Sequence, residues 1–232
     1  VAGDRTMFAM PETGIGFHPD VGGAYFLPRL MGELGVWMGL TGARLKTADC
    51  IAAGVATHYV PTESHPALIE ALETETLDDD GEKVDAILAK FAGDPGQSDL
   101  GMVQPLIDAA FEGDDLDAII HRLESAGDAW SKAVLKILSS KSPTAVKVTL
   151  AALRDRAGDR QGAIALTRRA LELERGRHAA LTNLALYLSR DPSTLAEAQA
   201  MAERAVALRP WKADGWTRLA GVLHAAGDQQ GA

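Results

Sequence analysis

Residues 11–23 read PETGIGFHPDVGG, and this stretch decides how the first part of the chain folds. Its four glycines and two prolines exclude a regular helix or a central strand. The apolar run MFAM at residues 7–10 indicates a short strand just before it. We therefore expect a strand followed by a structured loop, in which several backbone positions need a positive φ or a close approach.

Two carboxylates in this loop are the candidate catalytic residues. Glu12 and Asp20 lie eight residues apart, and a loop braced by Gly and Pro can hold both near one substrate. Such a pair works as acid and base when burial raises one pKa above the other. The spacing by itself favours a surface turn with two solvated acids. Assigning Glu12 and Asp20 as catalytic therefore depends on the full sequence of the loop.

The rest of the chain is expected to be mostly α, with a small β part. Residues 24–40 predict one or two short buried helices, broken near Pro28 and Gly32. Thr47 is expected to cap a short helix at 48–53 that leads into a strand at 55–60. Apolar residues three and four apart then predict helices at 66–77, 82–91, 102–111, 116–123 and 129–138, and Ser142-Pro143-Thr144 opens another.

The tail of the chain contains an internal repeat. Ala163, Ala198 and Ala232 mark one phase at spacings of 35 and 34 residues. A period near 34 with small residues at a fixed phase is typical of stacked helical hairpins, whose helices cross closely at those residues. Residues 149–232 resemble the tetratricopeptide repeat, best around Pro210 and Trp216. An alanine-rich helical bundle with an accidental period is the alternative.

Four separated stretches appear in one family's order. They are residues 8–23 (FAMPETGIGFHPDVGG), 25–30 (YFLPRL), 40–45 (LTGARL) and 53–58 (AGVATH). Together they closely resemble the 3-hydroxyisobutyryl-CoA hydrolases of the enoyl-CoA hydratase/isomerase (crotonase) superfamily. The resemblance continues through Ser142 and fades near Arg156. It implies the C-terminal portion of a crotonase-like α/β domain at 1–156, followed by tetratricopeptide-like helical repeats at 157–232.

This resemblance also implies roles for the loop residues. Glu12 matches the catalytic glutamate of the superfamily, as acid/base or nucleophile. Asp20 distinguishes the hydrolase branch from hydratases and would orient substrate or water. Hydrolysis of a short β-hydroxyacyl-CoA thioester, a step of valine degradation, is the implied reaction. The predicted substrate-binding residues are Gly16, Phe17, Gly22 and Gly23, the last two also expected to be structural, whereas His18 is expected to be non-catalytic.

The family's other half would supply what this segment does not. Family members begin well before the counterpart of Val1, and that half provides both backbone N–H groups for the thioester oxyanion and most of the coenzyme A pocket. We therefore expect no activity from these residues alone, and a fragment, a chimera and a natural pseudoenzyme all remain open. An enoyl-CoA hydratase/isomerase-type enzyme and a non-catalytic helical interaction module are the alternative functions.

Composition restricts the partners. The formal charge of −9 divides into 13 basic and 24 acidic residues (−11) at 1–156 and 10 basic and 8 acidic residues (+2) at 157–232. An acidic chain argues against nucleic acid and anionic membranes as partners. The expected partners are an acyl-CoA substrate and, in the alternative, a protein or peptide at the repeats.

Composition also bears on location and cofactors. The single cysteine, Cys50, is expected to be a small buried hydrophobe and fits a reducing compartment. No apolar stretch is long enough to span a membrane, so a cytoplasmic location is expected. The acidic run at 73–82 lacks the spacing of a calcium loop. No metal and no cofactor are expected, since coenzyme A belongs to the substrate.

Overall fold

A computed structural model describes residues 1–77, 81–113 and 115–230 of the chain. This part is mostly helical and contains a two-stranded antiparallel sheet, which confirms the predicted fold class. Strand β1 (Met7–Ala9) pairs with β2 (Arg44–Lys46), and Phe8 lies opposite Leu45. The strand expected at 7–10 is therefore present, whereas β2 was not predicted, because three residues are too short for a periodic pattern.

The segment after the loop forms three short helical elements. They are α1 (Gly23–Phe26), the 3₁₀ helix η2 (Leu27–Arg29) and α2 (Leu34–Thr41). The breaks expected near Pro28 and Gly32 are confirmed. A Cβ on Gly35 would lie 1.8 Å from the carbonyl oxygen of Leu27, so α2 packs directly on the η2 backbone.

Two local predictions between 47 and 60 are wrong. Helix α3 (Thr47–Ala52) begins at Thr47, whose hydroxyl donates to the Gly3 carbonyl at 2.7 Å instead of capping the helix. The strand expected at 55–60 does not form. The N–H groups of Val55 and Ala56 both donate to the Cys50 carbonyl, at 2.9 and 3.0 Å, and this turns the chain out of the extended conformation. A single parallel bridge joins Tyr59 to Ala2.

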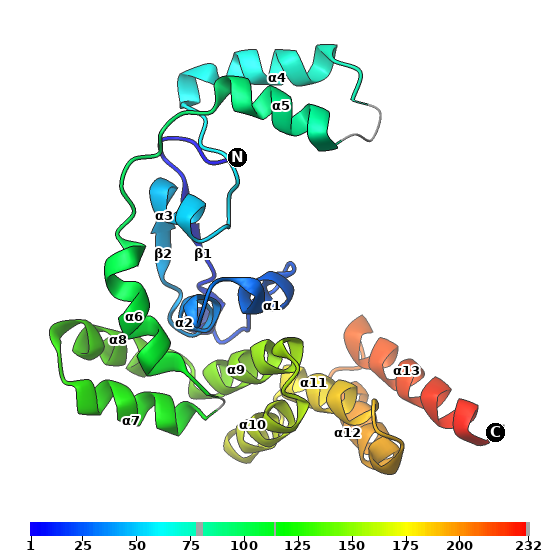
Figure 1. The fold of residues 1–232 in the computed structure, drawn as a ribbon. Coiled ribbons are helices and arrows are strands. Elements are labelled where there is room, and N and C mark those ends of the chain that lie inside the picture. The colour runs from blue at the N-terminus through cyan, green and yellow to red at the C-terminus, as the bar shows by residue number, and fades with distance from the viewer. Residues whose placement is uncertain (78–80, 114, 231–232) are drawn as a thin grey trace.

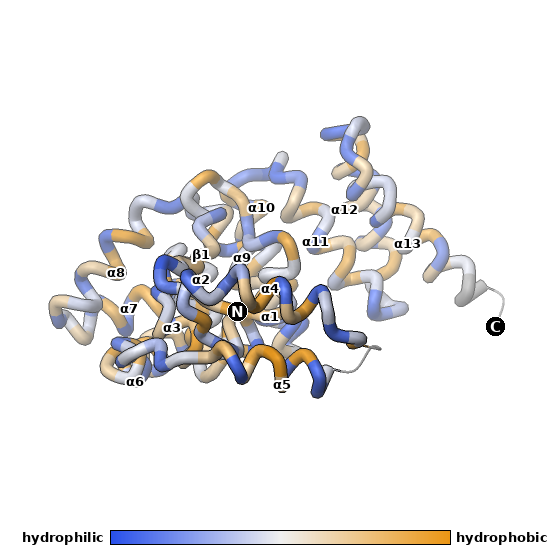
Figure 2. The backbone as a smooth tube through the Cα atoms, turned by 90° about the horizontal axis from the view of Figure 1, so that it is seen from above, coloured by the Kyte–Doolittle hydropathy of each residue, from blue (hydrophilic) through white to orange (hydrophobic). Residues whose placement is uncertain are grey.

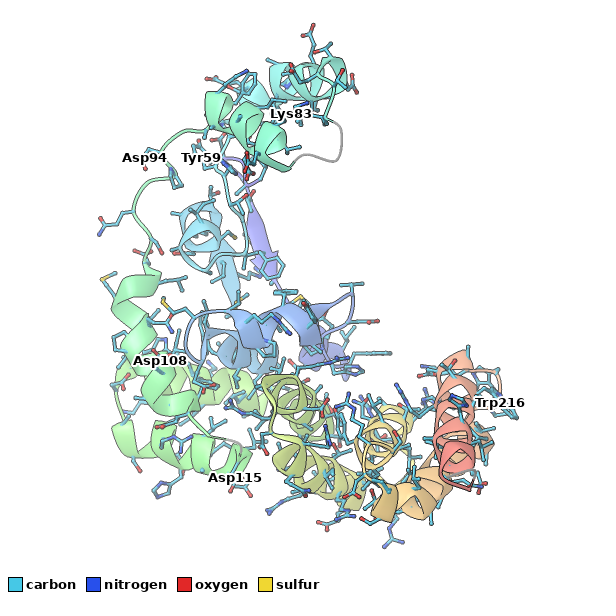
Figure 3. The ribbon with its side chains drawn as sticks, turned by 45° about the vertical axis from the view of Figure 1, so that its right-hand side comes forward. Tyr59, Lys83, Asp94, Asp108, Asp115 and Trp216 are labelled. Carbon is cyan, nitrogen blue, oxygen red and sulfur yellow. The ribbon has the colours of Figure 1, made fainter. Side chains whose placement is uncertain are left out.

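Helices α4 (His65–Thr74) and α5 (Gly81–Phe91) form a hairpin with its own apolar cluster around Val60, Leu68 and Ile87. Hydrophobic residues recur along α5 in Figure 2. Figure 3 places Tyr59 and Asp94 at the base of this hairpin, where the Gly93 N–H donates to the Tyr59 carbonyl at 2.9 Å. The predicted acidic run at 73–82 lies partly outside the described residues, at 78–80.

The predicted helices beyond residue 100 are confirmed with small shifts at their ends. They are α6 (Leu100–Phe111), α7 (Leu116–Ala126), α8 (Ala129–Ser139) and α9 (Pro143–Ala157). Ser142 caps α9, because its hydroxyl accepts from the Ala145 N–H at 3.3 Å. The Asp108 carboxylate on α6, labelled in Figure 3, accepts from the Glu33 N–H at 2.9 Å and so ties α6 to the start of α2.

The tail continues as packed antiparallel helices. They are α10 (Arg160–Leu173), α11 (His178–Leu188), the 3₁₀ helix η4 (Pro192–Thr194), α12 (Leu195–Leu208) and α13 (Ala213–Gln230). Ala163 and Ala198 are fully buried, as close helix crossings require, and Ala232 lies outside the described residues. These observations do not assign the helices to a repeat family.

One apolar core joins the two predicted domains. Its buried members run from Met10 to Val222, and the buried Asp155 carboxylate on α9 accepts from Arg190 after α11 at 2.9 and 3.1 Å. In Figure 1 the elements follow an open arc, from the α4–α5 hairpin at the top, through α6 to α8 at the left, to α13 at the right. The boundary at 156/157 falls at the end of α9 and stays a prediction.

Candidate functional site

The loop that follows β1 folds back on itself around Glu12. Glu12 opens the 3₁₀ helix η1 (Glu12–Ile15), and its carbonyl accepts from the Phe17 N–H at 2.8 Å. Gly16 closes this turn with a φ of 78°, a conformation that favours glycine. The Glu12 side chain is half-buried, and its Oε2 is fully buried with no hydrogen-bond partner among the described residues. An unpartnered buried carboxylate oxygen is costly, so this atom is a candidate for contact with a ligand.

Thr13 holds the loop to two distant elements. It is fully buried, its hydroxyl donates to the Leu40 carbonyl of α2 at 3.1 Å, and its carbonyl accepts from the Ser142 N–H at 3.3 Å. Sequence reasoning gave Thr13 no role. The available clue was a threonine next to the candidate glutamate in a loop whose backbone groups need partners.

Asp20 begins a second tight turn. Its carboxylate accepts from the Val21 N–H at 2.8 Å, and its carbonyl accepts from the Gly23 N–H at 2.7 Å. Val21 and Gly22 both take positive φ, at 44° and 87°. Asp20 is exposed, so the turn presents its carboxylate to solvent while the backbone leads into α1.

The predicted substrate-binding glycines have different surroundings. Gly23 is buried, and a Cβ there would lie 2.5 Å from Met10 Cε and 2.9 Å from Pro19 Cβ, so it is needed for packing. Gly22 is exposed and serves the turn by its positive φ. Gly16 and Phe17 line a cavity of about 130 Å³. Whether any of the four residues binds substrate stays a prediction.

The two carboxylates share one imidazole as a neighbour. Burial lowers the pKa of the half-buried His18, the negative charges of Asp20 and Glu12 raise it, and the positive charge of Arg177 lowers it. The structure therefore brings both candidate carboxylates into the electrostatic range of His18. It adds Arg177 from the tail, which the sequence did not suggest.

The loop that holds these carboxylates and the helix after it also carry exposed apolar side chains. Ile15, Phe17, Val21 and Tyr25 are all more than half exposed, and Val21 is 89% exposed. Carboxylates bordered by apolar surface suit an acyl chain beside a group that can accept a proton. In the described ranges no group of three or more His, Cys, Asp or Glu residues could hold a metal ion.

Cys50 lies apart from this site. It is fully buried, and burial raises the pKa of its thiol, which disfavours the reactive thiolate. The expected burial of Cys50 is thus confirmed.

The sequence model of one family, described as enoyl-CoA hydratase/isomerase, matches residues 1–175. The chain belongs to the enoyl-CoA hydratase/isomerase family. The match extends past the predicted boundary at residue 156 and includes α10, so it does not by itself divide the chain.

Among its relatives is the mitochondrial 3-hydroxyisobutyryl-CoA hydrolase of Xenopus laevis, 38% identical over 159 residues, which are 67% of this chain and 41% of that protein. The chain therefore spans about two fifths of the length of the curated relatives it matches. The structure of a carnitinyl-CoA dehydratase from Mycobacterium thermoresistibile is similar at 36% identity and a TM-score of 0.59, over 72% of this chain and 49% of that one.

An enoyl-CoA hydratase from Rhodobacter sphaeroides 2.4.1 is similar at 30% identity and a TM-score of 0.59, over 98% of this chain and 62% of that chain. These similarities support the crotonase-like fold. Within residues 1–77, 81–113 and 115–230, none of the helices has the length and hydrophobicity that crossing a membrane requires.

Proposed function

We propose that this chain carries the carboxylate part of an acyl-CoA thioester hydrolase site of the 3-hydroxyisobutyryl-CoA hydrolase type. The observation that carries the proposal is the buried, unpartnered Oε2 of Glu12, in a loop that continues as Pro-Asp-Val-Gly-Gly. The same proposal includes a step of valine degradation, a cytoplasmic location and a reaction that needs no further cofactor.

The proposed chemistry uses the two carboxylates differently. Glu12 either takes a proton from the attacking water and passes it to the departing coenzyme A thiolate, or attacks the thioester carbonyl itself and expels the thiolate. In the second route water then hydrolyses the acyl anhydride formed on Glu12, and the proton that this water releases neutralises the thiolate. Asp20, whose carboxylate is fixed by the Val21 N–H, orients the substrate or the water. The developing oxyanion needs N–H donors as well, and loss of one such donor costs roughly 10²–10³ in rate.

We propose further that the 232 residues by themselves turn over no acyl-CoA. The resemblance assigns both oxyanion donors to the half of family members that precedes the counterpart of residue 1. Incubation of the chain with 3-hydroxyisobutyryl-CoA is expected to release no thiol, and with crotonyl-CoA no hydration. Thiol release that disappears in Glu12→Gln would contradict this part of the proposal and show a working site.

A graft tests the carboxylates directly. Residues 1–156 would replace the matching segment of the Xenopus laevis relative, and thioester hydrolysis by the hybrid would be measured. Glu12→Gln is expected to lower kcat at least a hundredfold and Asp20→Asn to lower it strongly, whereas the exposed Glu70→Gln leaves it unchanged. A folded hybrid that hydrates crotonyl-CoA and does not hydrolyse the thioester would favour the hydratase alternative.

The tail supports a second, finer proposal, that residues 157–232 are tetratricopeptide-like hairpins able to receive a protein or peptide. The favouring observation is the complete burial of Ala163, Ala170, Ala198 and Ala205 where the helices cross. Ala198→Leu is expected to lower the melting temperature by overpacking that crossing, and the exposed Ala220→Leu is the matched control. Equal stability of both variants would contradict close crossing.

A further inference from the structure

A small cavity lies where the site loop meets the tail. Its volume is about 130 Å³. One side is formed by the loop at Gly16, Phe17 and His18, and the other by the start of α11 and the turn between α12 and α13. The cavity therefore joins the family's loop to residues beyond the family match, which ends at 175.

Three cations from the tail line this cavity. Arg177 is paired, since its Nη1 lies 3.5 Å from Glu174 Oε2. Arg209 and Lys212 form no ion pair or side-chain hydrogen bond with any residue in the part of the chain that the structure describes. Lys212 is half-buried, and Arg209 is exposed.

His178 adds a second observation at the same place. Only 3% of it is exposed, its Nδ1 lies 3.5 Å from Asp214 Oδ2, and its buried Nε2 has no partner among the described residues. Burial lowers the pKa of His178, Asp214 raises it, and the positive charges of Lys212 and Arg209 lower it. Both cations are therefore close enough to act on this imidazole.

The helix that starts at His178 adds to the positive electrostatic field of the cavity. Among the described residues, no side-chain hydrogen bond caps the N-terminus of α11, whose first residues line the cavity. The N–H groups at the start of a helix carry a partial positive charge and bind phosphate readily. Four carboxylates oppose this field, since Glu174 pairs with Arg177, Asp214 acts on His178 and His18, and Glu12 and Asp20 act on His18. None of the four forms an ion pair with Arg209 or Lys212 in the described part of the chain.

We propose that this cavity binds a phosphate group, held by Arg209, Lys212 and the amino end of α11. Pockets that hold a whole small-molecule ligand measure ~300–1,000 Å³, so about 130 Å³ suits one anionic group. The bound anion would lie beside Gly16 and Phe17, next to the candidate carboxylates. The inference does not depend on thioester hydrolysis, because the cations belong to the tail.

Calorimetric titration of the full chain with inorganic phosphate, at constant ionic strength, tests the site. One phosphate is expected to bind per chain, and Arg209→Gln/Lys212→Gln to weaken binding at least tenfold. The matched control, Lys132→Gln/Lys136→Gln, removes two exposed lysines from α8 and is expected to bind as the wild type does. Absence of binding, or equal binding by both double variants with unchanged circular dichroism, would overturn the proposal.

Two further titrations identify the source of the phosphate. Coenzyme A carries a 3′-phosphate that dephospho-coenzyme A lacks. If coenzyme A binds more tightly than phosphate and dephospho-coenzyme A does not, the bound group is the 3′-phosphate of coenzyme A. If phosphate and coenzyme A bind with similar affinity, the ligand is free phosphate. Both results support the site. Equal binding of acetate would overturn it by showing charge screening alone. Trp216, labelled in Figure 3, offers a second readout. Its Nε1 donates at 2.8 Å to the carbonyl of Pro210, which lies in the sequence between Arg209 and Lys212.

Discussion

Replacing Gly35 by alanine tests how closely α2 packs on the chain before it. The added Cβ would lie 1.8 Å from the Leu27 carbonyl oxygen and 2.4 Å from its carbonyl carbon. These are backbone atoms, so no rotamer change relieves the contact. Reaching even 3.0 Å from the oxygen requires a shift of 1.2 Å (3.0 minus 1.8) between α2 and η2, in a core where Leu27 is fully buried.

The magnitude follows from two opposing effects. Overpacking a filled core costs ~1–3 kcal/mol, occasionally more, and we take about 3 kcal/mol because the contacted atoms are backbone. Alanine in place of glycine within a helix contributes ~0.5–1 kcal/mol of stability. The difference is a loss of about 2 kcal/mol, which lowers the melting temperature by about 4–8 °C in a chain of this size.

Thermal unfolding followed by circular dichroism at 222 nm measures this effect, with Gly101→Ala as the control. Gly101 lies in the first turn of α6, is exposed, and has no atom within 4 Å of an added Cβ. The control is therefore expected to raise the melting temperature slightly, by about 1–3 °C. The same substitution would thus have opposite signs at two helical glycines. A Gly35→Ala protein as stable as the wild type would refute the close packing of α2 on η2.

Four shorter predictions follow. Arg190→Gln is expected to lower the free energy of unfolding, measured by urea titration, by about 2 kcal/mol, which is less than the ~3–5 kcal/mol of a fully buried pair. The reason is that the Arg190 side chain is 34% exposed, whereas that of Asp155 is 2% exposed. Asp155→Asn should lower the free energy of unfolding by less than Arg190→Gln does. Thr13→Val removes a buried hydrogen bond, so its urea midpoint should reflect a loss of about 1 kcal/mol. Because burial lowers the pKa of His178, the unfolded state binds the proton more tightly; stability should fall as pH drops below about 6.5, and His178→Gln should flatten that fall. Glu12→Gln should raise the free energy of unfolding, measured by urea titration, by up to about 1 kcal/mol; a lower value would show that the Glu12 carboxylate has a stabilising partner.

Local sequence patterns predicted most of the helices. They failed where backbone N–H groups had more than one possible hydrogen-bond partner nearby. The apolar periodicity at 102–111 and 129–138 predicted α6 and α8, because each helix buries one face. Residues 55–60, three of which are β-branched, have strand propensity, yet the N–H groups of Val55 and Ala56 bond to the carbonyl of Cys50. In the described part of the chain, this segment pairs only through the isolated bridge between Tyr59 and Ala2. Strand propensity is realised only where a neighbour completes the ladder.

The candidate site divides in the same way. Glu12, Asp20 and the glycines were predicted from the resemblance of one loop to a known family, and their roles stay predictions. The contacts of Thr13 with α2 and with the start of α9 could not, since they join residues 27 and 129 positions apart. Arg177 reaches the loop only through the packing of the tail, and nothing in the local pattern indicates it.

The buried oxygen of Glu12 is the point at which local structure and function conflict. A carboxylate oxygen without a partner costs stability, and an unconstrained loop would turn it toward water. This loop is constrained, because Thr13 ties it to α2 and α9, and Gly23 packs against Met10 and Pro19. The fold therefore maintains a group that a stability requirement alone would replace. Strain held in place by distant contacts is typical of sites that bind a ligand, and that is why Glu12 is the residue on which the proposed function depends.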